Sequence, residues 1–255
     1  MAETVATIEM VHDRLFLMAK TVTGILEKHD IPYSIAYGTL LGAVRHQDFI
    51  PWDDDFDIWL FDDTYDEAVE YLRNEMPPEL FLEDAKSEPM YFHAWAHVKD
   101  VNSVAKHDKY AQDAAYQHKG IHIDLYRCPR IKESDLWKYI DNENVKYFER
   151  RKEKGLISDE EYNLKMDKVR KDMEEHVSFK GDPGRIIYLF LIEKLYVDED
   201  TVFPLRKYKF RDTEFYGFNS ADKALTTLFG DYMSLPPVEE RIPIYSEVIF
   251  LDGQE

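Results

Sequence analysis

Four aspartates occupy a five-residue stretch near the start of the chain: Asp53, Asp54, Asp55 and Asp57. An apolar segment follows them directly. Carboxylates this close repel one another, so burying them before an apolar run is unfavourable unless a cation offsets their charge. Asp55 and Asp57 are two positions apart and share one face of an extended chain, an arrangement that suits hard divalent cations. The spacing predicts that Mg²⁺ or Mn²⁺ binds here and that the ion handles phosphate.

Two other interpretations of these aspartates compete with the metal site. One is a solvated acidic turn, which stays open. The other is an EF-hand calcium loop, because Asp53, Asp55 and Asp57 fit its first, third and fifth positions. That loop needs glycine at its sixth position and glutamate at its twelfth, where this chain has Ile58 and Thr64. An EF-hand is therefore excluded.

A further carboxylate lies in the segment Gly120–Cys128, which reads GIHIDLYRC. Apolar and polar residues alternate along it, which predicts a strand with Asp124 on its polar face. An acid in the middle of an apolar strand is costly to bury unless it is paired. We therefore expect Asp124 to be a third metal ligand, or the base that takes a proton from an acceptor hydroxyl. A salt bridge to Arg127 or Arg130 is the alternative.

A glycine-containing turn precedes the aspartates. Gly38 and Thr39 lie between a predicted strand at Tyr33–Tyr37 and a predicted short helix at Leu40–Arg45. Backbone N–H groups at such a turn can face a phosphate. An ordinary strand-to-helix glycine has the same pattern, so the main evidence for a phosphate site is the nearness of the aspartates.

The periodicity of the remaining chain predicts the elements that position these residues. We expect helices at Thr4–His29, Thr64–Asn74, Arg185–Tyr196 and Ala221–Phe229, strands at Asp55–Phe61 and Tyr91–Val98, and a hairpin at Phe203–Phe218. Asp54 should point away from the face that Asp55 and Asp57 share. On a strand, His93 and His97 would stand about 13 Å apart, and no HExxH pattern surrounds them, so they are not predicted to bind a catalytic metal.

A highly charged region at Lys132–Lys180 separates the Asp124 strand from the rest of the chain. Its sparse apolar positions predict two mostly exposed helices that separate near Gly155, with Ser158 capping the second. This region fits a solvated insertion, a lid or a partner surface better than a site of chemistry.

Composition limits the classes of function. The 255 residues are 44% hydrophobic and carry a net charge of -19, so the chain can build a substantial core and has no basic stripe for nucleic acid. Cys128 is the single cysteine, which excludes an internal disulfide or a thiolate metal cluster. Neither a signal peptide nor an apolar run of about 20 residues is visible, which predicts a cytoplasmic protein.

Several of these segments together resemble the LicD family, whose members include bacterial phosphocholine transferases and whose relatives include the fukutin-type sugar-phosphate transferases. The longest matching motif is GTLLGAVRHQDFIPWDDDFDI, at residues 38–58. The segments KHDIPYSIAYG, GIHIDLY and LFGDYMSLPPVEER also match. The resemblance covers most of the chain except the charged region.

The resemblance implies an α+β fold of the nucleotidyltransferase type, in which helices flank a small mixed sheet. It implies a single LicD-like catalytic domain over residues 1–255, with residues 132–180 as a charged helical insertion. By the same resemblance, Gly38 and Thr39 hold phosphate, and Asp55, Asp57 and Asp124 bind Mg²⁺ or Mn²⁺. The superfamily turn usually carries serine after its glycine, so Thr39 is a mild departure. Asp53 belongs to the LicD-type motif itself and is expected as an additional ligand.

The implied reaction moves a phospho-alcohol group, such as phosphocholine or a polyol phosphate, from a CDP-linked donor to a hydroxyl of a glycan or glycolipid. Such acceptors include lipopolysaccharide and teichoic acid, so peripheral contact with a membrane-bound acceptor is expected. Arg45 and His46, directly after the glycine turn, are candidates for holding the donor phosphate, and Arg127 is a weaker one.

Aromatic residues near the predicted site suggest how a choline group would be bound. Trp52, Trp95 and Tyr126 could surround a quaternary ammonium through cation–π contacts, although Trp52 fits a core position equally well. Two other functions remain open: true nucleotidyl transfer that releases pyrophosphate, and a catalytically silent metal-binding interaction protein.

Overall fold

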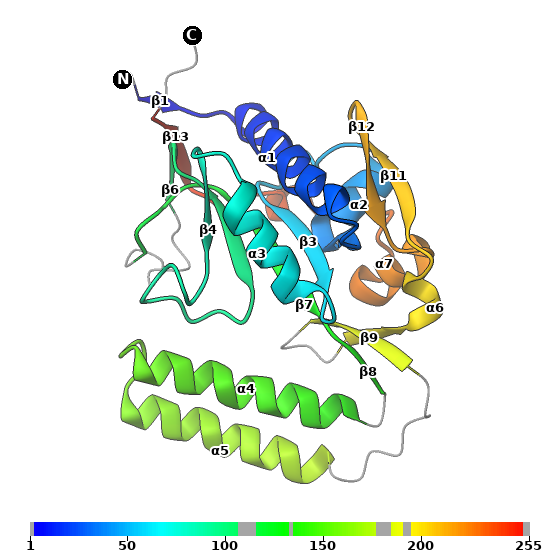
Figure 1. The fold of residues 1–255 in the computed structure, drawn as a ribbon. Coiled ribbons are helices and arrows are strands. Elements are labelled where there is room, and N and C mark those ends of the chain that lie inside the picture. Colours follow the sequence, from blue (N-terminus) through cyan, green and yellow to red (C-terminus); the bar gives the residue numbers. More distant parts are fainter. Residues whose placement is uncertain (1–2, 107–115, 133–134, 177–184, 191–194, 252–255) are drawn as a thin grey trace.

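The computed structural model describes residues 3–106, 116–132, 135–176, 185–190 and 195–251. It confirms the predicted α+β class: helices pack around several sheets, the largest of which is mixed. Figure 1 shows this largest sheet at the centre of the molecule, with helices on either side.

The central sheet has five strands in the order β2-β3-β7-β5-β4. Their bounds are Tyr33–Ile35 for β2, Phe56–Phe61 for β3, His122–Cys128 for β7, Ala96–Asp100 for β5 and Leu80–Glu83 for β4. β3 and β7 run parallel, whereas the other neighbours are antiparallel. The two predicted acid-bearing strands, which are distant in the sequence, are therefore direct neighbours.

One face of this sheet is covered by α1 (Ile8–Lys28) and α3 (Tyr65–Glu75), as Figure 1 shows. α1 begins after Thr7, whose side chain accepts a hydrogen bond from the N–H of Met10. The first residues of the predicted helix instead form the short strand β1 (Thr4–Val5). Leu15, Val22 and Leu26 of α1 belong to the same buried cluster as Ile58, Leu60 and Leu125 of the sheet, so this face is the main core.

The opposite face holds a smaller apolar cluster. Trp59, Phe61 and Cys128 pack there with Phe218. The nearby elements are α2 (Tyr37–Arg45) and α7 (Ala221–Phe229). The hairpin of β11 (Arg206–Phe210) and β12 (Thr213–Gly217) places Phe210 and Phe215 in the main core. This hairpin and α7, which ends at Gly230, confirm their predictions.

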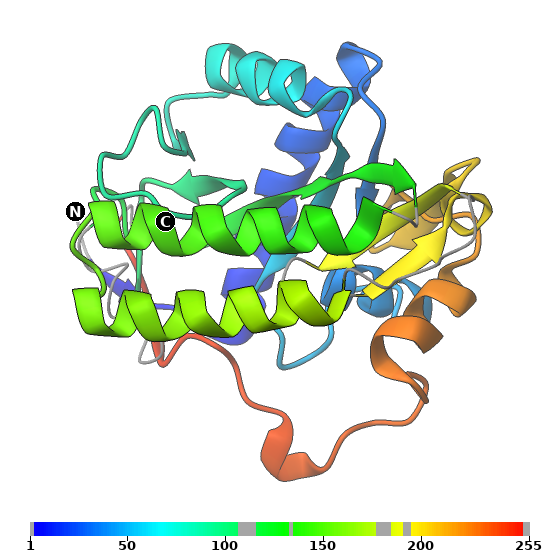
Figure 2. The ribbon, with the colours of Figure 1, turned by 90° about the horizontal axis from the view of Figure 1, so that it is seen from below.

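α4 (Leu136–Glu153) and α5 (Asp159–His176) lie side by side below the sheet in Figure 1, and Figure 2 shows them nearly parallel to one another in the view from below. Gly155 in the connection has a φ of +68°, and Ser158 Oγ accepts the N–H of Glu161. Both helices and the cap were predicted from the sequence. α4 contacts the body of the protein through Arg150, whose Nε donates to the carbonyl of Phe92.

The helix predicted at Arg185–Tyr196 is wrong. β9 (Arg185–Phe190) and β10 (Leu195–Asp198) pair there, and β8 (Arg130–Lys132) joins them to form a second sheet. A short run of apolar, β-branched and aromatic residues has no polar face, so its periodicity does not separate a buried helix from a strand.

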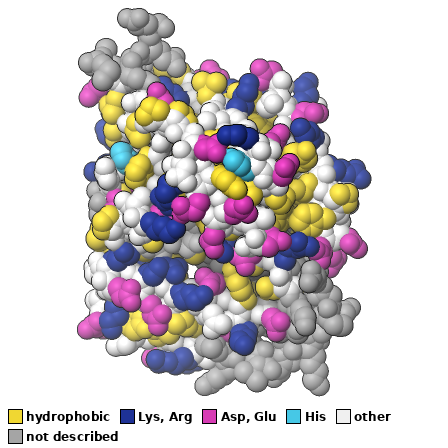
Figure 3. All heavy atoms as spheres, viewed as in Figure 1, with side chains coloured by type: hydrophobic (Ala, Val, Ile, Leu, Met, Phe, Trp, Pro, Cys, Tyr) yellow, Lys and Arg dark blue, Asp and Glu magenta, His cyan; other side chains and the backbone are white. Residues whose placement is uncertain are grey.

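The remaining elements are β6 (Ser103–Lys106) and β13 (Glu247–Phe250), which form a third sheet with β1, the short helix α6 (Glu199–Val202) and the 3₁₀ turn η3 (Val238–Glu240). In the described residues, no helix is both long and apolar enough to cross a bilayer. Figure 3 shows lysine and arginine side chains scattered among carboxylates on the face viewed in Figure 1.

Candidate active site

The candidate site lies on the sheet face that is turned away from α1 and α3. Asp57 of β3 pairs in register with Asp124 of β7, and Asp124 pairs in register with His97 of β5. Neighbouring strands lie about 4.8 Å apart, so these three side chains form one row across the sheet. Asp57 is 6% exposed and Asp124 is 8% exposed. The two predicted acidic segments therefore meet in a largely buried position.

The Gly38 turn packs directly against these acids. Gly38 and Thr39 lie in the first turn of α2 instead of preceding it, and the backbone of Tyr37 is in the left-handed region, with a φ of 40°. A Cβ at Gly38 would stand 2.5 Å from Oδ2 of Asp53, so any larger residue here would displace the Asp53 carboxylate. Thr39 Oγ1 accepts the N–H of Asp57 at 2.9 Å, which ties α2 to the acid-bearing strand.

The carboxylates of the 53–57 segment are not neutralised by basic side chains. Asp53, Asp55 and Asp57 have no ion-pair partner among the residues that the structure describes. Burial and the charge of Asp54 raise the pKa of Asp53 to about 6. Burial and the neighbouring carboxylates raise the pKa values of Asp55 and Asp57 well above their usual range. Asp57 is buried, and Asp53 and Asp55 are half-buried. Carboxylate oxygens without basic partners are suited to a hard divalent cation.

Asp124 lies in the opposite environment. Its Oδ1 accepts a hydrogen bond from Trp95 Nε1 at 2.6 Å and lies 3.0 Å from Nε2 of His97. Its Oδ2 lies 3.5 Å from Nε2 of His122. Although burial opposes ionisation, His97 and His122 hold the pKa of Asp124 well below its usual range.

The partners of His97 determine its protonation. Nδ1 lies 3.1 Å from Oε2 of Glu83, and Nε2 faces Asp124. Two carboxylates that face the two ring nitrogens favour the doubly protonated imidazolium, because an ionised carboxylate only accepts hydrogen bonds. Burial lowers the pKa of His97, but the two carboxylates outweigh that effect and raise it.

His122 is a neutral donor in the same network. Its Nδ1 lies 3.1 Å from Nζ of Lys99, and an ammonium group only donates, so the ring hydrogen sits on Nε2 and faces Asp124. Burial and the charges of Lys99 and His97 lower the pKa of His122 to about 4. We call Glu83, His97, Lys99 and His122 the histidine clamp on Asp124.

Part of this network could also bind a metal ion, because three of its ligand atoms lie close together. One atom each of His97, His122 and Asp124 lie within 4.8 Å of one another, so these three side chains could hold an ion if both rings gave up their Nε2 hydrogens. Among the described residues, these are the three side chains whose ligand atoms lie that close together, and the carboxylates of the 53–57 segment do not form such a group without an ion.

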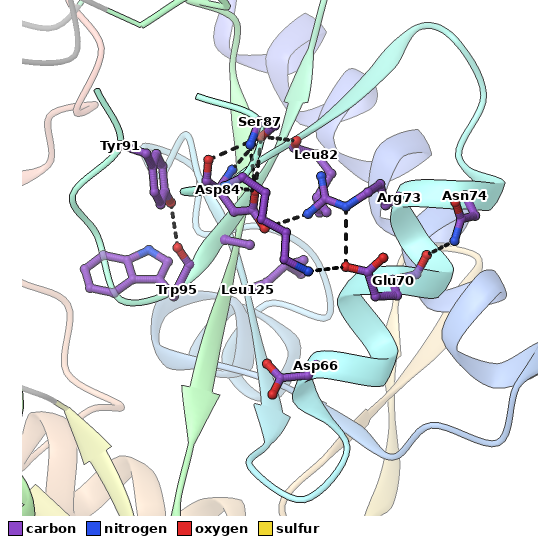
Figure 4. Close-up of polar contacts among 12 residues, drawn as sticks. Asp66, Glu70, Arg73, Asn74, Leu82, Asp84, Ser87, Tyr91, Trp95 and Leu125 are labelled. Carbon is purple, nitrogen blue, oxygen red and sulfur yellow. Dashed lines mark hydrogen bonds and ion pairs between the residues drawn. The ribbon is translucent and has the colours of Figure 1, made fainter. Parts of the chain in front are cut away.

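The separation predicted for His93 and His97 is wrong. Their ring centroids lie 5.2 Å apart, because β5 begins only at Ala96 and residues 91–95 do not form a strand. Tyr91 donates its hydroxyl to the carbonyl of Trp95 at 2.6 Å, which closes this bend, as Figure 4 shows. The bend directs the Trp95 side chain to Asp124. A bend between His93 and His97 leaves no pattern of residue types, so the contact between Trp95 and Asp124 could not be predicted from the sequence.

Asp54 has a role that the alternation of the strand did not predict. It is buried, and its two carboxylate oxygens accept the N–H groups of Ile244 and Tyr245 at 2.9 and 2.8 Å. Tyr245 in turn places its hydroxyl 3.0 Å from Nδ1 of His122. The aspartate segment thus anchors the chain near its C-terminal end against the site.

The other predicted binding residues are distributed unevenly. Arg45 donates to the carbonyl of Tyr232 at 2.6 Å and to Nε2 of His46 at 3.0 Å, so both lie beside the C-terminal part of the chain. The Trp95 and Tyr126 rings are 4.9 Å apart near Asp124. Trp52 is packed against the main core and lies 5.2 Å from the guanidinium of Arg241.

Arg127 is not brought to the site. It lies on the face of the sheet that carries α3, where it pairs with Asp62 at 2.8 Å and Asp66 at 2.5 Å. Arg130 pairs with Asp63 and Glu199. The alternative of a salt bridge from Asp124 to either arginine is therefore not observed.

Comparison with known proteins agrees with this geometry. Residues 30–162 match the family model described as LicD/FKTN/FKRP, nucleotidyltransferase domain. The chain is 23% identical over 259 residues to the lipopolysaccharide cholinephosphotransferase LicD of Haemophilus influenzae, a match that spans 89% of this chain and 91% of that protein.

Shorter matches cover a small part of the chain. An uncharacterized protein of Rickettsia prowazekii is 54% identical over 44 residues, and the human ribitol 5-phosphate transferase FKRP is 46% identical over 43 residues. Each of these covers 17% of this chain, with 16% and 9% of the respective relative. The family model spans about half of the chain, which confirms the resemblance seen in the motifs: the protein belongs to the LicD family.

Proposed function

We propose that this protein is a Mg²⁺- or Mn²⁺-dependent phosphotransferase that moves a phospho-alcohol group from a CDP-linked donor to a hydroxyl of a cell-surface glycan. The protein is a transferase acting on phosphate-bearing groups, as are the relatives named as a cholinephosphotransferase and a ribitol 5-phosphate transferase. The donor, the cation and the acceptor are the parts that we propose.

The observation that carries the proposal is the set of carboxylates of Asp53, Asp55 and Asp57, of which Asp57 is buried and the other two are half-buried, and none of which pairs with a basic side chain among the described residues. We expect Asp55 and Asp57 to hold the cation, with Asp53 as an additional ligand. A divalent cation at these oxygens would neutralise charge on a bound diphosphate and on its leaving group. Gly38 and Thr39 lie against the same carboxylates, so the backbone at the start of α2 borders the place of the phosphate.

Asp124 has a separate task in this proposal. The histidine clamp keeps its carboxylate ionised, and Trp95 and His97 both occupy Oδ1. Among the described residues, Oδ2 has only the longer contact with His122, so this oxygen is the one that could complete the metal site or accept a hydrogen bond from the attacking hydroxyl. The hydrogen bonds fix the direction of that oxygen before substrate arrives.

The alcohol of the donor would lie near the aromatic rings of Trp95 and Tyr126. Tyr126 also contacts Tyr37 with ring centroids 5.2 Å apart, so three rings line this side of Asp124. Aromatic faces attract a quaternary ammonium through cation–π contacts, which favours phosphocholine over an uncharged polyol phosphate. We also propose that residues 132–180, which include α4 and α5, are an insertion within a single catalytic domain.

One further candidate is nucleotidyl transfer, which the description of the matching family model supports. In that reaction the acceptor attacks the α-phosphorus, and pyrophosphate leaves. The same carboxylates would hold the cation, so the product released separates the two reactions.

The test is a screen of CDP-choline, CDP-glycerol and CDP-ribitol with a glycan acceptor, with and without Mg²⁺. We expect CMP to be released from one donor in a Mg²⁺-dependent manner, with CDP-choline as the leading candidate. Release of pyrophosphate from a nucleoside triphosphate would support nucleotidyl transfer instead. If neither product forms and titration with CDP-choline and Mg²⁺ gives no binding heat, the protein does not carry out this reaction.

A further inference from the structure

A segment near the end of the chain approaches the site without burying many of its own side chains. We call residues 230–245 the C-terminal arm. Figure 2 shows it leaving α7, passing through η3 at the lower edge of the view, and reaching β13. Exposed apolar side chains are frequent along it, including Met233, Val238 and Ile242. Polar contacts, more than apolar burial, therefore hold the arm in place.

Three side chains contact backbone groups of the arm. Asp54 accepts the N–H groups of Ile244 and Tyr245. Arg45 Nη1 donates to the carbonyl of Tyr232 at 2.6 Å, and Arg241 Nε donates to the carbonyl of Pro236 at 2.9 Å. Both arginines thus donate hydrogen bonds to backbone carbonyls in the same part of the arm. Arg45 does so from the end of α2, and Arg241 is itself a residue of the arm.

Neither arginine has a carboxylate partner within the described part of the chain. The contacts of Arg45 are with His46 and with two backbone carbonyls, and those of Arg241 are with Pro236 and the Trp52 ring. In contrast, Arg127 and Arg211 each pair with two aspartates. The contrast is informative because the chain has 51 acidic and 32 basic residues. A basic side chain therefore has many carboxylates with which it could pair.

The two guanidinium groups also repel each other. Burial and the positive charge of Arg241 both lower the pKa of Arg45. Arg45 contacts the carbonyls of Tyr232 and Ser234 and Arg241 contacts that of Pro236, so both guanidinium groups lie on the same stretch of the arm, without a counter-ion among the described residues. An anion between them would relieve their repulsion. Planar guanidinium groups bind phosphate oxygens through paired N–H donors, which makes phosphate the anion that fits best.

We propose that Arg45 and Arg241 form an anion site for a phosphate or diphosphate group at the edge of the candidate active site. Arg45 is the last residue of α2, whose first turn contains Gly38, and Arg241 lies over Trp52, the residue before Asp53. Because Trp52 directly precedes Asp53, a diphosphate held at Arg241 would lie beside the 53–57 segment. The assignment of this diphosphate to a CDP-linked donor rests on the proposed function, whereas anion binding itself does not.

A purely structural role is the alternative, in which the arginines only pin the arm. The two roles differ in what they require of Arg241. A pin needs one N–H donor to the carbonyl of Pro236, whereas anion binding needs the positive charge and the paired donors of the guanidinium group.

The experiment measures binding of inorganic pyrophosphate by calorimetry, with and without Mg²⁺, for the full chain and three variants. Arg241→Gln removes the charge, Arg241→Lys keeps the charge without the paired donors, and Arg206→Gln is the control. Arg206 is exposed on β11 and has no carboxylate partner among the described residues, so this control removes the same charge elsewhere. Hydrogen exchange of the arm amides follows its position in each variant.

We expect Arg241→Gln to weaken pyrophosphate binding by about tenfold or more, Arg241→Lys to weaken it less, and Arg206→Gln to leave it unchanged. Exchange in the arm should change little. Unchanged affinity in Arg241→Gln, or an equal loss in Arg206→Gln, would overturn the proposal. So would a loss that tracks faster exchange throughout the arm and that lysine fails to restore. Pyrophosphate binding without transfer from any CDP-linked donor would leave this site standing and refute the proposed function.

Discussion

Asp57 and Asp124 lie opposite each other on neighbouring strands, yet the side chains around them carry opposite charges. Asp57 is surrounded by carboxylates, and burial and these neighbours raise its pKa. Asp124 is surrounded by the histidine clamp, which lowers its pKa in spite of burial. Among the described residues, cationic side chains lie around Asp124, whereas none pairs with Asp57. The cation that we propose beside Asp57 would complete a site divided in this way.

The two sides suit different tasks. A carboxylate that is satisfied by fixed hydrogen bonds keeps its orientation and charge through the reaction. Carboxylates that lack partners repel one another, and a divalent cation relieves that repulsion when it binds. Binding of the proposed cation would thus be favoured by repulsion in the metal-free protein, while the hydrogen bonds of Asp124 would keep that carboxylate in place.

The largest effect is expected from Asp57→Asn, which removes one of the carboxylates that lack basic partners in the part of the chain that the structure describes. Transfer should fall by about a thousandfold or more, because the carboxamide is a poor ligand for a hard cation. The metal-free variant should nevertheless be more stable than the wild type, with a Tm higher by about 2–4 °C, since one repelling charge is gone. CMP release and thermal unfolding without metal measure these two changes.

Asp66→Asn is the matched control for Asp57→Asn, because Asp66 is an exposed aspartate paired with Arg127 outside the site. It should leave transfer within about twofold of wild type, since exposed ion pairs contribute little. Retained turnover in Asp57→Asn would refute the assignment of Asp57 to the cation.

The second-largest effect is expected in the histidine clamp around Asp124. His97→Phe keeps the volume of the ring but leaves Glu83 and Asp124 buried without their shared partner. Removing one member of a buried charged network is strongly destabilising, so we expect the free energy of unfolding to fall by about 3–5 kcal/mol. Urea unfolding measures this change.

His29→Phe is the control for that variant. His29 also bonds a carboxylate, Glu75, at 2.6 Å, but in a partly exposed position, so its loss should lower stability by about 1 kcal/mol or less. Equal losses in His29→Phe and His97→Phe would show that the histidine clamp does not hold Asp124 as described.

The two sides were not equally accessible to sequence reasoning. The spacing of Asp55 and Asp57 is local, and the alternation around Asp124 is local as well, so both could be predicted. The histidine clamp draws Glu83, His97 and His122 from three strands, and the pairing of those strands is not written in any short motif.

Irregular backbone explains most of the remaining differences. The bend at residues 91–95 replaced a predicted strand and brought Trp95 to Asp124. Asp54 and Arg241 act mainly through backbone groups of the C-terminal arm, and backbone partners leave no pattern of residue types. By contrast, α4, α5 and the β11–β12 hairpin followed their periodicity and turn signals.

A smaller effect is expected from pH. In the metal-free protein the pKa of Asp53 is raised from its ordinary 3.8 to about 6. Between these values the folded state keeps a proton that the unfolded state has lost, so stability should fall as pH rises from about 4 to about 6. Asp53→Asn should remove that part of the fall, and saturating Mg²⁺ should oppose it. Identical unfolding profiles for wild type and Asp53→Asn across this range would show that Asp53 does not carry the raised pKa.

The smallest effect is expected from Arg127→Gln, because the structure places Arg127 on the far face of the sheet with Asp62 and Asp66. Its loss should change stability by about 1 kcal/mol or less and transfer by less than about twofold. A larger loss of transfer would mean that Arg127 reaches substrate, as its position after Asp124 in the sequence first suggested.

The most direct test of the divided site is a titration with Mn²⁺ at neutral pH, in which electron paramagnetic resonance reports the free ion. We predict that the wild type binds Mn²⁺ and releases protons as it does so, and that Asp57→Asn loses this binding. His97→Phe, at a temperature where it is folded, should retain more of the binding than Asp57→Asn. If instead Asp57→Asn binds as the wild type does and His97→Phe does not, the cation belongs to His97, His122 and Asp124, and its assignment to the 53–57 segment is wrong.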